Sequence, residues 1–270
     1  MFEYTPENLR KLQLAELPAL KEVDRICREN NIKYIIDAGT LLGAVRHGGF
    51  IPWDDDVDIR MLRADYDKFC EVCEKQLDKR FFLQTYKTDP HFRWTYARIL
   101  INGTKYMRAG HEHQKARNGV FIDIFPDDNL PEKGIGRWEC TMLSLLCRKI
   151  LYSEVGMKSA PSAAKRLGFT ILNKVPKQWA HRQMEYLSRK YRNSNTRLVR
   201  CFGWGSEVET RGFLKEWLQD ISEIEFEGIR VFCPLNTHNY LVFSFDEEYM
   251  KLPPVNERKA GHPASEIYFG

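Results

Sequence analysis

Four aspartates lie within five positions of one another, in the segment IPWDDDVDIRM: Asp54, Asp55, Asp56 and Asp58. The alternation of acidic and apolar residues predicts a strand here. Because successive side chains of a strand point to opposite faces, Asp56 and Asp58 share one face. Two ionised carboxylates at that spacing repel each other. Mg²⁺ prefers oxygen ligands and often binds one or two carboxylates together with substrate phosphates, so the pair predicts half of a phosphate–metal site.

A third acid and a glycine–threonine turn extend this pattern. Asp123 is the one charge in the apolar run VFIDIF. Burying a lone carboxylate is costly unless it is paired or metal-bound, which favours a site residue over an edge-strand residue facing water. Upstream, Gly39 and Thr40 precede a short helix that we expect over 41–45, and N–H groups at a helix N-terminus bind phosphate.

Two arginines are candidate phosphate ligands. Arg46 lies between the glycine–threonine turn and the acids. Its planar guanidinium suits bidentate binding of a diphosphate, and the alternative is an ordinary surface arginine. Arg98, in a predicted strand near Thr104 and Lys105, is a further candidate.

The elements that must position these residues predict an α+β fold. Hydrophobic periodicity indicates helices over 7–30, with a break or kink at Pro18, and over 65–77, 138–152 and 178–191. Strands are expected over 32–36, 57–61, 81–86, 94–101, 104–107, 120–125, 229–233 and 240–245. Asn102-Gly103 predicts a turn, Pro126 the end of a strand, and 156–177 a looser stretch. We therefore expect a mixed sheet flanked by helices over 1–130, then a basic helical region and a short α/β tail over 131–270.

Composition and charge narrow the class of protein. The chain has 270 residues, 43% hydrophobic and 29% charged, as in an ordinary globular protein. Residues 133–200 hold fifteen Lys or Arg and three Asp or Glu, a net charge of +12 within a total of +4. One interpretation of this block is that it binds an anionic partner: nucleotide phosphates, a phosphorylated lipid carrier or an anionic membrane. The alternative is a solvated helical face without a partner. Without a long apolar run or an apolar leader, we expect a cytoplasmic location.

The run GTLLGAVRHGGFIPWDDDVDI, followed by RADYDKF, resembles the signature of the LicD family, relatives of the fukutin proteins. FIDIFPDD and YMKLPPVNER also fit. The resemblance is dense over 9–130, sparse over 131–240, and returns at 249–262. It implies a nucleotidyltransferase-like fold and transfer of a phospho-headgroup, such as phosphocholine, from a CDP-linked donor. The implied acceptor is a hydroxyl of a bacterial surface glycan, in lipopolysaccharide or teichoic acid, or of its lipid-linked precursor.

By position, the resemblance implies that Asp56 and Asp58 bind metal and that Asp123 is the third acid. His262 falls where the family often has a histidine, without an assigned role. With Mg²⁺ or Mn²⁺ as cofactor, Asp123 would complete the metal shell or take the proton of the acceptor. The residues predicted to bind the donor are Gly39, Thr40, Arg46 and Arg98.

Several alternatives use the same residues differently. Attack at the α-phosphorus would make the protein a nucleotidyltransferase that attaches a nucleotide to its acceptor. A non-catalytic binding protein is disfavoured because all three acids are present. Aromatic residues in the basic block suggest RNA binding as a further alternative. Their helical spacing favours core positions instead, so we expect no nucleic-acid partner. The segment 138–152 is either a buried core helix or a peripheral membrane contact.

Overall fold

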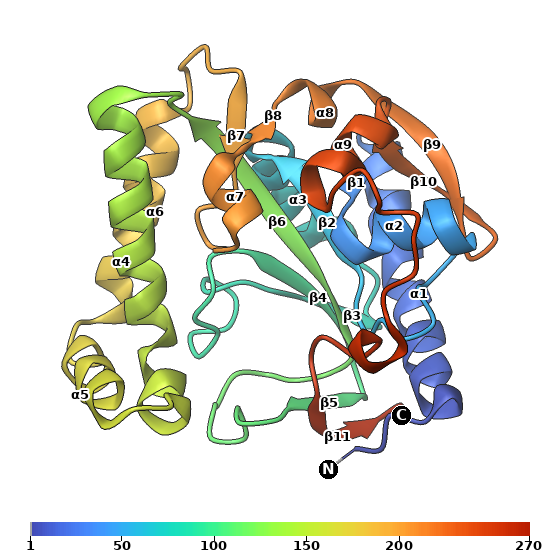
Figure 1. The fold of residues 1–270 in the computed structure, drawn as a ribbon, viewed down its shortest axis with the longest axis horizontal. Helices are drawn as coiled ribbons and strands as arrows, with labels where there is room; N and C mark the ends of the chain where they lie inside the picture. The colour runs from blue at the N-terminus through green and yellow to red at the C-terminus, as the bar shows by residue number, and fades with distance from the viewer. Residues whose placement is uncertain (1) are drawn as a thin grey trace.

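A mixed sheet runs through the centre of the molecule. The computed structural model describes residues 2–270, and its main sheet has the strand order β1-β2-β6-β4-β3, with β7 beside β6 and β8 beside β7 (Figure 1). β2 and β6 run parallel, and their neighbours are antiparallel. The strands are β1 (Ile35–Ile36), β2 (Asp58–Leu62), β3 (Phe81–Gln84), β4 (Ala97–Ile101), β6 (Phe121–Leu130), β7 (Leu198–Arg200) and β8 (Phe213–Leu214). The predicted α+β class is confirmed.

The two faces of the parallel pair β2–β6 differ in chemistry. Ile59 and Ile124 point to one face and join the main hydrophobic core. Helices α1 (Pro6–Glu29) and α3 (Arg63–Gln76) pack on this face and contact both strands or their neighbours. Because side chains alternate along a strand, Asp58 and Asp123 point to the opposite face. One layer of helices therefore supports the sheet and leaves the acids on its other side.

The long first helix is continuous through Pro18, so the predicted break is wrong. Thr5 caps its N-terminus by accepting from the Asn8 N–H, and Pro6 occupies the first position, where no N–H is needed. The hydrogen bond that Pro18 cannot make would reach back one turn to Leu14, whose side chain is exposed. Packing of Leu20, Val23 and other buried residues holds the helix together.

Strand β6 continues through Pro126 to Leu130, beyond the predicted end at Phe125. On one side it pairs with β4 up to Ile124 and with β7 from Asp128. Pro126 falls in the gap between these two partners, where a missing N–H costs no ladder bond. The prediction failed because proline ends a strand only where its N–H is needed.

Three helices form a separate body beside the sheet, which we call the helical module: α4 (Gly134–Ser159), α5 (Ala163–Leu172) and α6 (Lys177–Tyr191). It stands at the left of Figure 1 and has its own core, which includes Cys147, Leu151 and Leu187. Helix α5 lies inside the stretch predicted to be looser, so that prediction is wrong there. Ser162 caps α5 by accepting from the Lys165 N–H. No helix within residues 2–270 is both long and apolar enough to cross a membrane.

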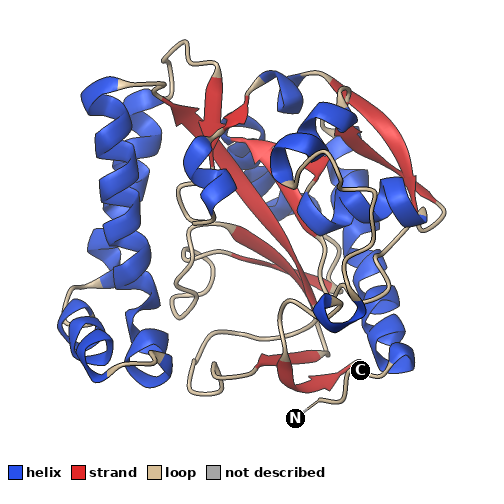
Figure 2. Cartoon of the chain, in the orientation of Figure 1, coloured by secondary structure: helices blue, strands red, loops and turns tan. Residues whose placement is uncertain are grey.

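The last part of the chain is a series of short helices and strands joined by loops (Figure 2). Its elements are α7 (Glu207–Arg211), α8 (Glu216–Gln219), β9 (Ile221–Phe226), β10 (Ile229–Pro234), α9 (Thr237–Ser244), η1 (Val255–Glu257) and β11 (Ala264–Tyr268). The predicted strand over 240–245 is wrong, because Asn236 caps a helix there by accepting from the Asn239 N–H. β11 pairs with β5 (Lys105–Arg108), so the tail lies against the first half of the chain.

Candidate active site

Asp58 and Asp123 are direct neighbours across the parallel strand pair. They are register partners on β2 and β6, and the Asp123 N–H donates to the Val57 carbonyl at 3.0 Å. Arg98 on β4 is the register partner of Asp123 on its other side. Its Nε lies 2.7 Å from Asp123 Oδ1. The sheet therefore aligns two predicted acids and one predicted arginine in a row on one face.

Helix α2 (Ala38–His47) fixes the strand that carries Asp58. The Thr40 hydroxyl accepts from the Asp58 N–H at 3.0 Å, and the Asp37 N–H donates to the Asp58 carbonyl at 2.9 Å. A Cβ on Gly39 would lie 2.2 Å from Asp54 Oδ2. We call residues 54–57, just before β2, the acid loop. In this conformation Gly39 and Thr40 therefore shape the acid loop. The Asp54 carboxylate fills the space beside the start of α2, where a phosphate was predicted.

Several acids around this row have no cation as a partner among residues 2–270, although Arg98 pairs with Asp123. Glu16 of α1 is buried, and its Oε2 has no hydrogen-bond partner in residues 2–270. Burial and the neighbouring aspartates raise the pKa of Glu16 well above its usual range. Burial, followed by Asp56 and Asp123, does the same to the pKa of Asp58. Among the described residues no ion pair reaches Asp58 or Asp54. An uncompensated cluster of carboxylate oxygens fits a divalent cation.

Asp55 differs from its neighbours because its oxygens are already engaged. It is buried and accepts from the N–H groups of Gly261 at 2.8 Å and of His262 at 3.1 Å. The hydroxyls of Tyr4 and Tyr106 lie at 3.4 and 3.5 Å from its Oδ2. Asp55 therefore fastens the C-terminal tail to the acid loop, and the consecutive aspartates do not share one role.

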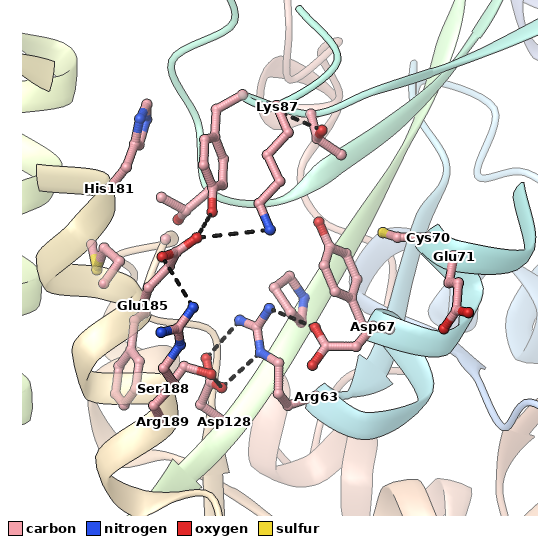
Figure 3. A pocket seen from close by; sticks show the side chains of 18 of the residues that line it. Arg63, Asp67, Cys70, Glu71, Lys87, Asp128, His181, Glu185, Ser188 and Arg189 are labelled. Atoms are coloured by element: carbon pink, nitrogen blue, oxygen red, sulfur yellow. Dashed lines mark hydrogen bonds and ion pairs between the residues drawn. The ribbon is translucent and has the colours of Figure 1, made fainter. Parts of the chain in front are cut away.

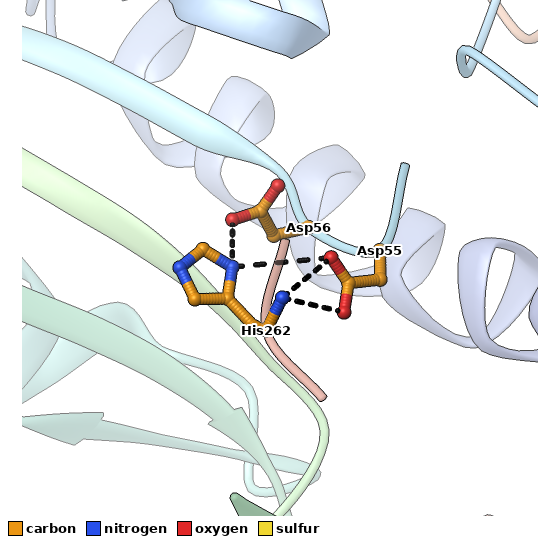
Figure 4. Close-up of side chains that lie close together, drawn as sticks. All are labelled: Asp55, Asp56 and His262. Carbon is orange, nitrogen blue, oxygen red and sulfur yellow. Dashed lines mark hydrogen bonds and ion pairs between the residues drawn. The ribbon is translucent and has the colours of Figure 1, made fainter. Parts of the chain in front are cut away.

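This fastening brings His262 to the acids (Figure 4). Its Nδ1 lies 2.7 Å from Asp56 Oδ2 and 3.9 Å from Asp55 Oδ1. The ligand atoms of the three residues lie within 4.8 Å of one another, which is close enough to hold a metal ion. Burial alone would lower the pKa of His262, but its contact with Asp56 raises it. In the sequence, only the family resemblance marked His262, without a role.

The two predicted arginines have different surroundings. Arg98 holds Asp123 and stacks over the Phe121 ring at 3.9 Å. Burial raises the pKa of Asp123 although Arg98 lowers it, so this carboxylate can accept a proton. Arg46, by contrast, donates to the carbonyls of Tyr249 at 2.9 Å and Lys251 at 3.2 Å. Its guanidinium holds the tail in this structure.

A buried charge cluster beneath the site escaped the sequence analysis. Arg60, the second residue after Asp58 on β2, pairs with Asp127 at 2.8 Å and also with Asp37 and Glu209. Its guanidinium lies 4.0 Å from the centre of the Phe213 ring. One cation thus joins β2, the start of α2, the end of β6 and α7. The signal was the period-two alternation after Asp58, which places Arg60 on the acid face.

A hollow of about 370 Å³ between α3 and α6 lies on the other face of the sheet (Figure 3). Its wall includes Asp128, five positions after Asp123 and therefore on the opposite side of β6. Its charges pair with one another: Arg63 with Asp128 at 2.8 Å, and Arg189 with Glu185 at 3.6 Å. This hollow does not open on the acids.

A different opening lies on the acid side. Arg98 lines a narrow hollow of about 60 Å³, together with Phe92, Arg93 and Gln114. The last three also line a cleft of about 700 Å³ between the core and the helical module, where Lys177 is among the lining residues. The cleft thus continues from the helical module toward the arginine that holds Asp123.

The chain is similar in sequence to several known proteins. Residues 31–144 match the model of the LicD/FKTN/FKRP nucleotidyltransferase domain. Over 264 residues the chain is 28% identical to the lipopolysaccharide cholinephosphotransferase LicD of Haemophilus influenzae, covering 94% of this chain and 96% of that protein. Over 95 residues it is 33% identical to the human ribitol 5-phosphate transferase FKRP, covering 28% of this chain and 19% of that protein. An uncharacterized protein of Rickettsia typhi is 43% identical over 79 residues, covering 28% and 25%.

Proposed function

Because this chain is a LicD-family protein, with the family's nucleotidyltransferase domain over residues 31–144, we propose that it transfers a phospho-headgroup from a CDP-linked donor. Phosphocholine is the headgroup that the relative from Haemophilus influenzae supports best. The acceptor is a hydroxyl of a cell-surface glycan or of its lipid-linked precursor. The ribitol 5-phosphate transferase relative supports the wider class of phospho-headgroup transfer.

One observation carries this proposal. Asp58 and Asp123 are register partners, Asp56 lies beside them, and the pKa of Asp58 is raised by burial and by both neighbours. Carboxylates that destabilise one another in this way are a poor structural arrangement and a good cation site. We assign Asp56 and Asp58 to hold Mg²⁺ or Mn²⁺, and we assign Asp123, whose two oxygens are contacted by Arg98, to proton transfer. When bound, such an ion supplies positive charge to the diphosphate of the donor.

The chain's own groups then have distinct tasks. The acceptor oxygen attacks the β-phosphorus, which carries the headgroup; a new P–O bond forms, and the bond to the CMP oxygen breaks. Asp123, whose pKa burial has raised, takes the proton of the acceptor hydroxyl. Arg98 orients Asp123 and offers its remaining N–H groups to the donor phosphates. Arg46 holds the tail segment at 249–251 and so acts on the site indirectly.

The acceptor reaches Asp123 along the cleft beside the helical module. The cleft shares Phe92 and Arg93 with the hollow that Arg98 lines. Its wall also includes Lys174 and Lys177 from the basic block. We therefore propose that 1–130 is the catalytic core and that 131–270 contributes acceptor recognition. A lipid-linked acceptor would be met at the inner face of the cytoplasmic membrane, and we propose that location for the reaction.

The second candidate is nucleotidyl transfer, which the description of the matched domain favours. The same acids would serve, but the acceptor would attack the α-phosphorus. Product analysis separates the two reactions. Headgroup transfer releases CMP and leaves the phospho-headgroup on the acceptor. Nucleotidyl transfer from a nucleoside triphosphate releases pyrophosphate and leaves a nucleotide there.

The deciding experiment follows CMP release from CDP-choline by the purified protein with Mg²⁺ or Mn²⁺, with and without EDTA. We expect metal-dependent release that Asp56→Asn abolishes. Asp220→Asn is the matched control, because Asp220 is an exposed acid at the end of α8 and forms no ion pair within residues 2–270. Absence of release from every CDP-linked donor and glycan acceptor, with metal binding demonstrated, would refute headgroup transfer. A panel of nucleoside triphosphates would then test the second candidate.

A further inference from the structure

We propose that the outer face of the helical module docks on the surface of an anionic lipid bilayer. This outer apolar face consists of Ile135, Trp138, Met142, Leu145 and Leu146 of α4, Leu167 and Ile171 of α5, and Trp179 of α6. The inference concerns a surface away from the acids and is independent of which headgroup is transferred.

Helix α4 exposes its apolar residues in one continuous stripe. Ile135 is 85% exposed and Trp138 is 65% exposed, and Met142, Leu145 and Leu146 follow at helical spacing. Lys149 continues the stripe in the next turn and is exposed as well. Single exposed apolar residues are ordinary, but a stripe along several turns marks an interaction surface.

Helix α5 adds a second apolar stripe. None of its ten residues is buried. Its inner side is anchored by Phe169, which packs so closely on Gly156 of α4 that a Cβ there would lie 2.4 Å from the ring. Leu167 is 63% exposed and Ile171 is 59% exposed. Helix α5 packs on α4 through Phe169 and Leu172, and it leaves Leu167 and Ile171 in water without a partner that would cover them.

The three helices meet at a shallow apolar hollow of about 640 Å³. Leu146 of α4, Leu172 of α5 and Trp179 of α6 line it, and Arg182 stands at its edge. The hollow joins the stripe of α4 to the other two helices. Tryptophan beside arginine is suited to the boundary between acyl chains and headgroups, because each side chain has an apolar part and a polar end.

Charge identifies an anionic surface as the partner. The three acids of residues 133–200 are all in ion pairs: Glu139 with Lys190 at 2.6 Å, Glu154 with Lys177 at 2.9 Å, and Glu185 with Arg189 at 3.6 Å. Among the ion pairs of residues 2–270, none engages the exposed cations beside the apolar face. These cations are Lys149, Lys165, Lys174 and Arg182.

A lipid surface fits this combination better than a second copy of the chain. Two copies joined through this face would bring the same cations together, which is unfavourable. An amphipathic helix with apolar residues on one side and cations around them lies in the interface of an anionic membrane. Since no described helix is suited to crossing the bilayer, the module would lie on it.

Flotation with vesicles of phosphatidylglycerol and phosphatidylcholine, compared with phosphatidylcholine alone, tests the proposal on the full chain. We expect binding to the anionic vesicles that weakens with salt. Leu167→Glu with Ile171→Glu is expected to abolish it, while Leu235→Glu, at an exposed apolar residue in the turn after β10, leaves it unchanged. Lys149→Gln with Lys165→Gln is expected to lower the partition coefficient about 25-fold, at about fivefold per cation. Lys79→Gln is its matched control.

Circular dichroism and release of CMP from the soluble donor confirm that each variant is folded. Absence of binding by the unchanged protein, or full binding by Leu167→Glu with Ile171→Glu, would overturn the proposal. A dimer that this double variant dissociates, without vesicle binding, would assign the face to a second copy and also overturn it. If the unchanged protein binds vesicles but releases no CMP, the proposed transfer fails and the docking surface stands.

Discussion

His262 Nδ1 lies 2.7 Å from Asp56 Oδ2, so a residue of the C-terminal tail touches the acid loop in the first quarter of the chain. Asp55 makes this contact possible, because it accepts the N–H groups of Gly261 and His262 and thereby orients the tail. The acid loop is thus completed from two directions, by strand β2 and by the tail.

His262→Ala is therefore expected to weaken Mn²⁺ binding by about 10- to 100-fold, as the loss of a residue that orients or joins a metal shell does. Calorimetric titration with Mn²⁺ measures this without relying on turnover. His238→Ala is the control, because His238 is exposed and contacts Tyr249 outside the acid loop. Equal Mn²⁺ affinity in the His262→Ala variant and the unchanged protein would remove His262 from the site.

Asp58→Asn is expected to reduce CMP release about a thousandfold or more, since several kcal/mol of charge stabilisation are lost. The same change should raise the Tm of the metal-free protein, because burial of the Asp58 charge and its repulsion from Asp56 and Asp123 disappear. Thermal unfolding in EDTA measures the second effect. A lower Tm would show that the Asp58 carboxylate has a favourable partner in the metal-free protein.

Gly39→Ala is expected to displace the Asp54 carboxylate, because the new Cβ would lie 2.2 Å from Oδ2. We expect about 1–3 kcal/mol of destabilisation and at least about tenfold lower CMP release. Gly168→Ala in α5 is the matched change, since nothing lies within 4 Å of a Cβ there. It should stabilise the protein by about 0.5–1 kcal/mol. Identical effects of the two changes on activity would contradict the close packing at Gly39.

Lowering the pH should weaken the ion pair by which Glu154 of the helical module contacts Arg93 of the core. Burial alone would raise the pKa of Glu154, but Lys177 and Arg93 lower it to about 2. A carboxyl with a lowered folded pKa stabilises the protein above its unfolded pKa, near 4.3, and this contribution is lost as the pH falls toward 2. Tm measured between pH 6 and about pH 2 should fall less steeply in Glu154→Gln than in the unchanged protein. Parallel curves would exclude Glu154 as a source of the acid sensitivity.

Several features of the site could be predicted from local spacing. Period-two alternation predicted Asp58 on a strand, although Asp56 lies in the loop before β2, and the lone charge in the apolar run marked Asp123. The register of β2 and β6 then made Asp58 and Asp123 direct neighbours, as expected of acids that act together. Their roles in binding metal and transferring the proton stay predictions until the variants above are measured.

Other assignments depended on contacts that lie far apart in the sequence. Backbone N–H groups at Gly39 and Thr40 were expected to bind phosphate, which stays a prediction; the sequence did not indicate that the Thr40 hydroxyl accepts from the Asp58 N–H. Arg46 was expected at the diphosphate, yet its guanidinium meets carbonyls of the tail. A side chain's partner is whichever group the fold brings within about 3 Å of it, and spacing along the chain cannot indicate that group.

The sequence by itself determined the fold class, the place of Asp58 on a strand and the basic character of residues 133–200, because alternation and composition are local properties. Tertiary structure alone decided that Pro126 continues a strand, that residues 240–245 are helical, and that Asp55 holds the tail. In each case the tertiary surroundings overrode the local preference: Pro126 lies in the gap between β4 and β7, Tyr240 and Leu241 are buried in the core, and N–H groups of the tail reach Asp55.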